Sequence, residues 1–182
     1  MKDLIVTPSG LRVANTVLPC VIGKNGATRF KREGDGKTPS GKHQIVGMLY
    51  RPDRILQPRS WAIPIRPRDI WSDDIKDPDY NLIGSTPTLF HHERLFRPDH
   101  LYDLVILTNW NWPYAVKGRG SAIFIHTWRR NGYPTEGCIA LSKDNLLRVA
   151  KFIDYGTRLI VPETLHAHQK WRTQHEYGSL QS

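Results

Sequence analysis

The chain has 182 residues, which is enough for one domain with its own hydrophobic core. Its 14 glycines and 13 prolines favour turns and short elements over long helices. With 26 Lys and Arg against 17 Asp and Glu, the formal net charge is +9, so the surface attracts anionic partners. The basic residues are dispersed and match no nucleic-acid-binding motif, and no run of 18 apolar residues could span a membrane. We therefore expect neither nucleic acid nor a membrane as a partner.

Short apolar and β-branched runs recur along the chain and are separated by clusters of Gly, Pro, Ser, Asn and Asp, a pattern that predicts strands joined by turns. The glycine-rich stretch 34–41 is typical of a loop. Residues 51–103 show little periodicity, and we expect a long irregular region with short strands that covers or serves a site. The expected strands are residues 4–6, 11–13, 17–22, 43–50, 101–108, 122–126 and 158–161.

One helix is clear in the sequence. Ser142 is a suitable N-cap, and Asp144 lies in the first turn, where its negative charge is favourable. Apolar residues then recur at helical spacing between 146 and 153, and Gly156 is expected to end the helix. The sequence therefore predicts a mainly β, sandwich or barrel-like fold with one or two short α-helices.

The two cysteines have different surroundings. Cys20 lies in an apolar strand and is expected to be a buried, inert thiol. Cys138 follows Gly137, and His126 ends a strand twelve residues earlier. A thiol needs a base or a positive neighbour to act as a nucleophile near neutral pH, and a glycine allows backbone amides to converge on an oxyanion. Zinc is a competing use of Cys and His, but the four closely spaced ligands of a structural zinc site are missing.

This segment resembles the L,D-transpeptidase catalytic domain family, often called YkuD-like. The family motif is a His, a variable stretch, and then Ser/Thr-x-Gly-Cys; His126 and Thr135-Glu136-Gly137-Cys138 are similar to it. The loop 34–41 resembles the family's Thr-Pro-x-Gly turn, and the resemblance covers about residues 17–161 of a single catalytic domain (1–182) with a polar tail (162–182). Two positions depart from the pattern: Glu136 stands where many members have His, and Ala140 where many have Arg or Asn.

The resemblance implies the family's fold and an acyl-transfer enzyme, without cofactor or metal, that acts on peptidoglycan stem tetrapeptides carrying diaminopimelate and ending in D-Ala. In this scheme the Cys138 thiol attacks the carbonyl on the L-centre of diaminopimelate. His126 accepts the thiol proton from within hydrogen-bond reach, and the carbonyl of Thr127 orients the imidazole. The amides of Gly137 and Cys138 hold the oxyanion. The expected substrate-binding residues are Arg119, Arg129, Arg130, Thr135 and Glu136.

Three functions follow from this resemblance. The N-terminus lacks the apolar segment of a secretory signal, so we expect a cytoplasmic protein, or a periplasmic one if a leader precedes this sequence. A cytoplasmic enzyme would act in muropeptide recycling, as an L,D-carboxypeptidase that releases terminal D-Ala. The alternatives are an L,D-transpeptidase that forms 3-3 cross-links and a non-catalytic peptidoglycan-binding module. The presence of both Cys138 and His126 argues against the module.

Overall fold

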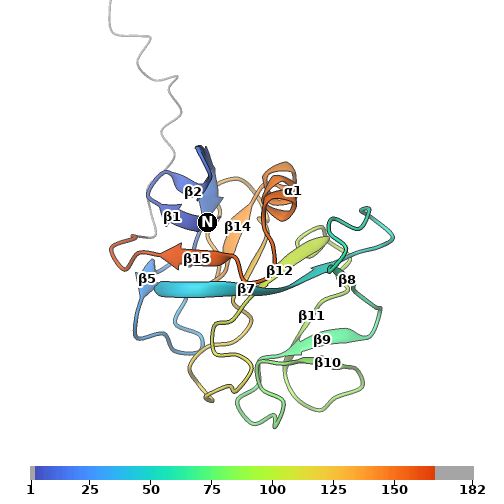
Figure 1. Cartoon of the computed structure of the whole chain (residues 1–182). Helices are drawn as coiled ribbons and strands as arrows, with labels where there is room; N and C mark the ends of the chain where they lie inside the picture. The colour runs from blue at the N-terminus through green and yellow to red at the C-terminus, as the bar shows by residue number, and fades with distance from the viewer. Residues whose placement is uncertain (1–2, 167–182) are drawn as a thin grey trace, which may run out of the picture.

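The computed structural model of the protein describes residues 3–166 and is mainly β, with one α-helix in that range (Figure 1). Ten strands form the main sheet, and two smaller sheets accompany it. The main sheet contains β1 (Leu4–Thr7), β2 (Gly10–Val13), β3 (Thr16–Leu18), β4 (Cys20–Val21), β7 (Gly41–Tyr50), β8 (Ile63–Pro64), β12 (Leu104–Thr108), β13 (Phe124–Thr127), β14 (Ile139–Leu141) and β15 (Arg158–Val161). The smaller sheets contain β5 (Ala27–Thr28) with β6 (Thr38–Pro39), and β9 (Asp69–Ser72) with β10 (Ile83–Ser85) and β11 (His92–Arg94).

The main sheet curls into a nearly closed barrel. Its strands lie in the order β3-β2-β1-β15-β7-β12-β13-β14-β4, with β8 beside β7. The two edge strands, β3 and β4, are separated in the chain by Pro19 alone, so the two edges of the sheet must come together. Fully buried residues from strands all around the sheet, such as Leu4, Ile106 and Ile125, fill its core. The predicted mainly β, barrel-like fold with a short helix is confirmed.

The predicted strand over 17–22 and the predicted end of the helix are wrong, whereas the predicted start of the helix is confirmed. The single strand expected over 17–22 is broken at Pro19, because proline has no N–H to continue a hydrogen-bond ladder. Helix α1 (Lys143–Phe152) begins after the predicted N-cap Ser142, whose hydroxyl accepts from the Asn145 amide. It ends before Ile153, which is already extended, rather than at Gly156. Of the predicted polar tail, residues 167–182 lie outside the described part of the chain.

Residues 51–103 contain short strands, as predicted, and pack against the barrel as a cover. Their three-stranded sheet (β9, β10 and β11) and the segment that follows it contribute to a second apolar cluster, which also includes residues of the barrel strands β7, β12 and β13. In this cluster the rings of Trp71 and Phe124 meet edge to face at 4.9 Å, and Leu95 is fully buried. The cover therefore lies against the outer side of the strands that carry the predicted site.

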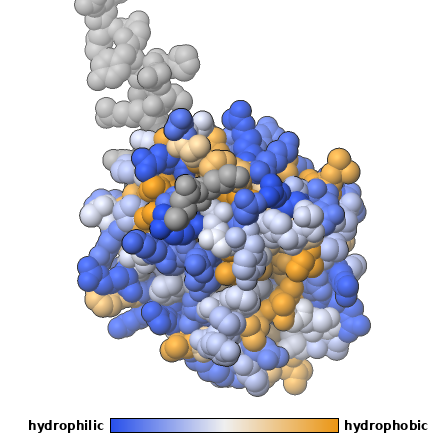
Figure 2. All heavy atoms as spheres, viewed as in Figure 1, coloured by the Kyte–Doolittle hydropathy of each residue, from blue (hydrophilic) through white to orange (hydrophobic). Residues whose placement is uncertain are grey.

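Hydrophilic residues occupy most of the face seen in Figure 2, with smaller hydrophobic patches between them. This agrees with the high content of charged residues in the sequence. Within residues 3–166, no helix has the length and apolar character needed to cross a bilayer.

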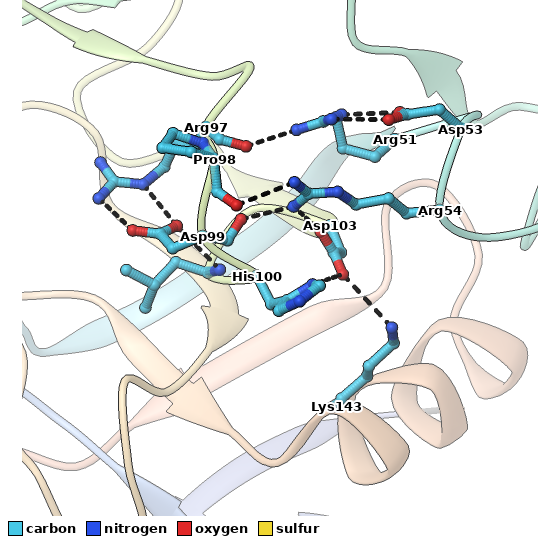
Figure 3. Close-up of polar contacts among 10 residues, drawn as sticks. Arg51, Asp53, Arg54, Arg97, Pro98, Asp99, His100, Asp103 and Lys143 are labelled. Carbon is cyan, nitrogen blue, oxygen red and sulfur yellow. Dashed lines mark hydrogen bonds and ion pairs between the residues drawn. The ribbon is translucent and has the colours of Figure 1, made fainter.

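A buried carboxylate ties the two ends of the cover to each other and to helix α1 (Figure 3). The side chain of Asp103 is 1% exposed and accepts from Arg54 at 2.8 Å, His100 at 2.8 Å and Lys143 of α1 at 3.3 Å. Burial alone would raise the pKa of Asp103, but these three hydrogen bonds hold it below its ordinary value. The guanidinium of Arg54 also donates to the main-chain carbonyls of Pro98 and Asp99. Asp103 thus fixes the segment that leads into β12.

We predict that Asp103→Ala lowers the free energy of unfolding by about 3 kcal/mol, because it removes a buried carboxylate with three hydrogen bonds and leaves the part-buried guanidinium of Arg54 without its ion-pair partner. Urea denaturation of the variant beside wild type measures the loss. Asp79→Ala, which removes an exposed carboxylate of the same cover, should change stability by less than about 0.5 kcal/mol. Equal losses in the two variants would contradict an anchoring role for Asp103.

Candidate active site

The predicted nucleophile and base lie on neighbouring strands of the barrel. Strands β13 and β14 are parallel, with Ile125 opposite Ile139 and His126 opposite Ala140, and Cys138 directly precedes β14. Successive side chains of a strand point to opposite faces. Since Ile125 faces the barrel core, His126 faces the cover. The Cys138 side chain packs against the apolar cluster on that same side. The strand pairing thus brings the thiol and the imidazole to one face.

The thiol of Cys138 is held by the backbone. Its Sγ donates to the Ala122 carbonyl at 3.0 Å and accepts from the Phe124 amide at 3.3 Å. In the part of the chain that the structure describes, Cys138 forms no hydrogen bond with His126, so the hydrogen bond expected between them is absent. In this structure the Ala122 carbonyl accepts the hydrogen bond from the thiol. The thiol must leave this hydrogen bond before it can transfer its proton to His126.

His126 is buried and oriented. Its Nδ1 donates to the Thr127 carbonyl at 2.8 Å, the contact expected of Thr127, which leaves Nε2 unprotonated and able to accept a proton. The ring of Tyr102 packs edge-on against the imidazole, with centroids 5.3 Å apart. Burial lowers the pKa of His126 to about 4 and raises the pKa of Cys138 to about 12. Both groups are therefore neutral near pH 7 in the absence of substrate.

A clamp of hydroxyl groups fixes the loop that carries Cys138. The Thr135 hydroxyl donates to the Cys138 carbonyl at 2.6 Å and accepts from the Gly137 amide at 3.1 Å. From the glycine-rich loop, the buried Thr38 hydroxyl donates to the Gly137 carbonyl and accepts from the Gly23 amide, both at 2.8 Å. The loop is thus held on both sides. The Gly137 amide, expected to bind an oxyanion, has Thr135 as its partner in this structure and must exchange it to do so.

The predicted substrate-binding residues are dispersed. Glu136 is exposed and forms an ion pair with Lys24 at 2.8 Å, so its carboxylate points away from the thiol. The guanidinium of Arg119 lies over the Trp110 ring at 5.1 Å, and that of Arg130 over the Tyr133 ring at 4.6 Å. Arg129 is exposed. Only Thr135, through its contact with Cys138, touches the nucleophile among these five residues.

Asn81 is a positioning residue that the sequence reasoning did not identify. Its buried carboxamide oxygen accepts from the Ala122 amide and from the Trp71 ring nitrogen, both at 2.9 Å. Ala122 has a φ of +50°, a strained conformation for a residue with a Cβ. Because the Ala122 carbonyl holds the thiol, Asn81 positions Cys138 through Ala122, which lies 41 positions after Asn81 in the sequence.

Lys31 supplies a buried positive charge at the site. Its side chain is 3% exposed, and its Nζ donates to Asp35 at 2.6 Å and to the Arg32 carbonyl at 2.7 Å. Its alkyl chain passes close to Gly137. Burial dominates the pKa of Cys138, and the charge of Lys31 opposes this effect by lowering it. Among the described residues, no group of three or more His, Cys, Asp and Glu is arranged to hold a metal ion.

Comparison with known proteins places these features in a family context. A model of the YkuD family, described as the L,D-transpeptidase catalytic domain, matches residues 7–161. No curated protein sequence matches the chain. Among solved structures, the chain is similar to an L,D-transpeptidase from Mycobacterium smegmatis (16% identity, TM-score 0.41) and to L,D-transpeptidase 1 of Mycobacterium tuberculosis (14% identity, TM-score 0.40). Each match covers 88% of this chain and 59% of the other.

A third similar structure is a variant of the helical cell shape determining protein Pgp2 from Campylobacter jejuni, at 18% identity and a TM-score of 0.44. The match covers 92% of this chain and 50% of that protein. The chain therefore spans between half and three fifths of the length of these solved relatives.

The first prediction from the site concerns Gly137. A Cβ at this position would lie 2.9 Å from the Lys37 carbonyl oxygen, a backbone atom that cannot turn away. We expect Gly137→Ala to destabilise the fold by about 1 to 3 kcal/mol in urea denaturation. At Gly84 a Cβ would meet only the Ile70 side chain at 3.6 Å, so Gly84→Ala is the matched control and should have little effect. A Gly137→Ala variant as stable as the control would show that the loop is not tightly clamped.

The second prediction concerns acid. The folded protein keeps His126 neutral down to about pH 4, whereas an unfolded chain protonates it near 6.5. Between these values the unfolded state binds more protons, so stability should fall as the pH is lowered through this window, by up to about 3 kcal/mol. Burial lowers the pKa of His43 as well, and His43 adds to the slope.

Urea denaturation at a series of pH values measures this slope. His126→Gln should flatten it, while His166→Gln, which replaces an exposed histidine, should leave it as in wild type. An unchanged slope in His126→Gln would mean that the imidazole is not held neutral in the folded protein.

Proposed function

The chain belongs to the L,D-transpeptidase catalytic domain family, and from this premise we propose that it is a cysteine-dependent L,D-carboxypeptidase that removes the terminal D-Ala from peptidoglycan stem tetrapeptides. The observation that carries the proposal is the arrangement of Cys138 and His126 on one face of paired strands, with the imidazole oriented by the Thr127 carbonyl. That orientation leaves Nε2 free to accept a proton. A binding module would have no use for it, and this favours an enzyme.

The first half of the reaction forms a thioester. Substrate binding draws the Cys138 thiol from the Ala122 carbonyl, and His126 Nε2 takes the thiol proton. The sulfur attacks the carbonyl on the L-centre of diaminopimelate, and the oxyanion that forms is held by backbone amides at 137–138. When the intermediate collapses, the carbon–nitrogen bond to D-Ala breaks, and the imidazolium gives its proton to the departing amine.

The second half regenerates the thiol. His126 removes a proton from a water molecule, which attacks the thioester carbonyl, and the carbon–sulfur bond breaks. The product is a tripeptide with a new carboxylate, and the proton returns to the sulfur. An amine from a second stem peptide could take the place of water, in which case the product is a 3-3 cross-link.

Position 140 supports water as the acceptor. Ala140 is fully buried opposite His126, where many members of the family have Arg or Asn. Its methyl group offers no hydrogen bond to an incoming peptide, whereas water needs no binding residue. The Glu136 carboxylate points outward to Lys24, so the motif itself places no carboxylate beside the thiol.

We expect the wild-type protein to convert disaccharide-tetrapeptide to disaccharide-tripeptide and free D-Ala, with little cross-linked dimer even at high substrate. Liquid chromatography with mass detection measures the ratio of tripeptide to dimer. Cys138→Ala should release no D-Ala, because the attacking sulfur is gone. Cys20→Ala should keep wild-type activity, since burial holds that thiol protonated and raises its pKa to about 12.

Each contrary outcome has its own meaning. An excess of dimer over tripeptide would establish the cross-linking alternative. Release of D-Ala by Cys138→Ala would contradict the assignment of Cys138 as the nucleophile. Binding of tetrapeptide by wild type with no product of either kind would favour the non-catalytic module.

A further inference from the structure

Glu93, in the middle of strand β11, has unused hydrogen-bonding capacity beside the candidate active site. Its side chain is 36% exposed, and Oε2 accepts from the Tyr102 hydroxyl at 2.9 Å. The nearest cation, Nη1 of Arg97, is 4.0 Å from the same oxygen, beyond hydrogen-bond distance. Within residues 3–166, Oε1 has no partner. An ionised carboxylate can accept about four hydrogen bonds, so most of this capacity is open to a ligand.

Tyr102 links Glu93 to His126, the proposed base. The Tyr102 ring packs edge-on against the His126 imidazole at 5.3 Å, and its hydroxyl reaches Glu93. The charge of Glu93 also acts on the nucleophile: after burial, which is the main effect, it raises the pKa of Cys138 further. Glu93 and His126 therefore both contact Tyr102, which places the Glu93 carboxylate one side chain away from the proposed base.

The neighbouring charges favour a cation at this place. Arg97 is the positive charge nearest to Glu93, but Asp99 already binds its guanidinium at two points, 2.9 Å and 2.7 Å. Among the described residues, Glu93 therefore has no hydrogen-bonded counter-charge of its own, because the Arg97 guanidinium is bound to Asp99, which also lies in the field of Arg129. A ligand with a positive head group would balance this charge, whereas an anion would be repelled.

We propose that Glu93 binds a primary ammonium group of the peptide substrate beside Cys138. The proposal rests on the proposed function, because that function supplies a peptide with such a group: diaminopimelate carries a free ammonium on its D-centre. This group could belong to the donor peptide whose L-centre carbonyl is attacked, or to an acceptor peptide that approaches the thioester. In either case Oε1 of Glu93 accepts a hydrogen bond from the ammonium.

This role gives the charge of Glu93 a function in the reaction. Without substrate, the carboxylate adds to the burial that keeps the thiol protonated. A bound ammonium cancels that charge, so it lowers the pKa of Cys138 at the moment when a substrate is present. Burial remains the main effect on this pKa, so the bound ammonium removes only the part that Glu93 adds, and His126 still takes the thiol proton.

The test is a binding measurement in the Cys138→Ala variant, which cannot turn the peptide over. Calorimetry compares the disaccharide-tetrapeptide with the same compound acetylated on its D-centre amine. If the donor supplies the ammonium, acetylation should weaken binding about 10- to 100-fold, the effect of losing a hydrogen bond to a charged group. In Cys138→Ala with Glu93→Gln, the two peptides should bind equally and weakly, because the amide keeps the Tyr102 contact but has no charge.

Asp144→Asn in the Cys138→Ala background is the matched control, since it removes an exposed carboxylate on helix α1, and it should keep the preference for the free amine. If the acceptor peptide supplies the ammonium, acetylation of the D-centre amine should leave binding of the donor peptide unchanged. Glu93→Gln in the active enzyme then lowers the small amount of dimer that wild type forms at the highest substrate concentration, relative to tripeptide, about tenfold or more. Either result supports the proposal.

The proposal is overturned if acetylation weakens binding equally with Glu93 and with Gln at that position. It is also overturned if Glu93→Gln changes neither donor binding nor the product ratio, or if no peptide binds. Failure of the proposed function gives a different result: the wild-type protein releases no D-Ala, while the preference for a free amine persists in Cys138→Ala.

Discussion

The hydrogen bond from the Cys138 thiol to the Ala122 carbonyl is the contact on which the rest of the site depends. It requires the strained φ of +50° at Ala122, which Asn81 stabilises by accepting the Ala122 amide. It also requires that the nucleophile lie beneath the cover, where burial favours the neutral thiol. Strain of this kind persists only where the surroundings determine it fully. Here the buried carboxamide of Asn81 and the surrounding apolar cluster determine the conformation of Ala122.

The barrel and its cover have separate tasks at this site. Strand pairing fixes His126 and Cys138 relative to each other, and the Thr38 and Thr135 hydroxyls hold the loop that bears the thiol. The cover, anchored through Asp103, brings Tyr102 onto the imidazole and Glu93 next to Tyr102. The barrel thus presents the reacting groups. The cover buries them and so favours their neutral forms.

The sequence predicts the parts of this arrangement that depend on local patterns. The apolar strand that ends in His126, the capped helix after Ser142 and the His-to-Cys motif are each visible in a few consecutive residues. Asn81 and Glu93 could not be found in this way, because the residues that they contact lie outside their own segments. Asn81 contacts Ala122, Glu93 contacts Tyr102, and neither belongs to a chemical motif. The direction of Glu136 and the occupied Gly137 amide depend on single hydrogen bonds, which a sequence pattern does not specify. Pro19 shows a signal that the prediction did not use: proline has no N–H for a strand ladder, yet the strand over 17–22 was expected to be continuous.

The central claim is that the site stores Cys138 as a neutral thiol beside a neutral imidazole, and that the proton moves only when substrate arrives. An ion pair of thiolate and imidazolium would be the opposite arrangement, and the burial of both groups disfavours it. The most direct test is the ultraviolet absorbance of the thiolate, titrated with pH in substrate-free wild type and in Cys138→Ala. The account predicts no difference between the two proteins around neutral pH and a Cys138 signal only in strong alkali. A thiolate absorbance at neutral pH that disappears in Cys138→Ala would contradict it.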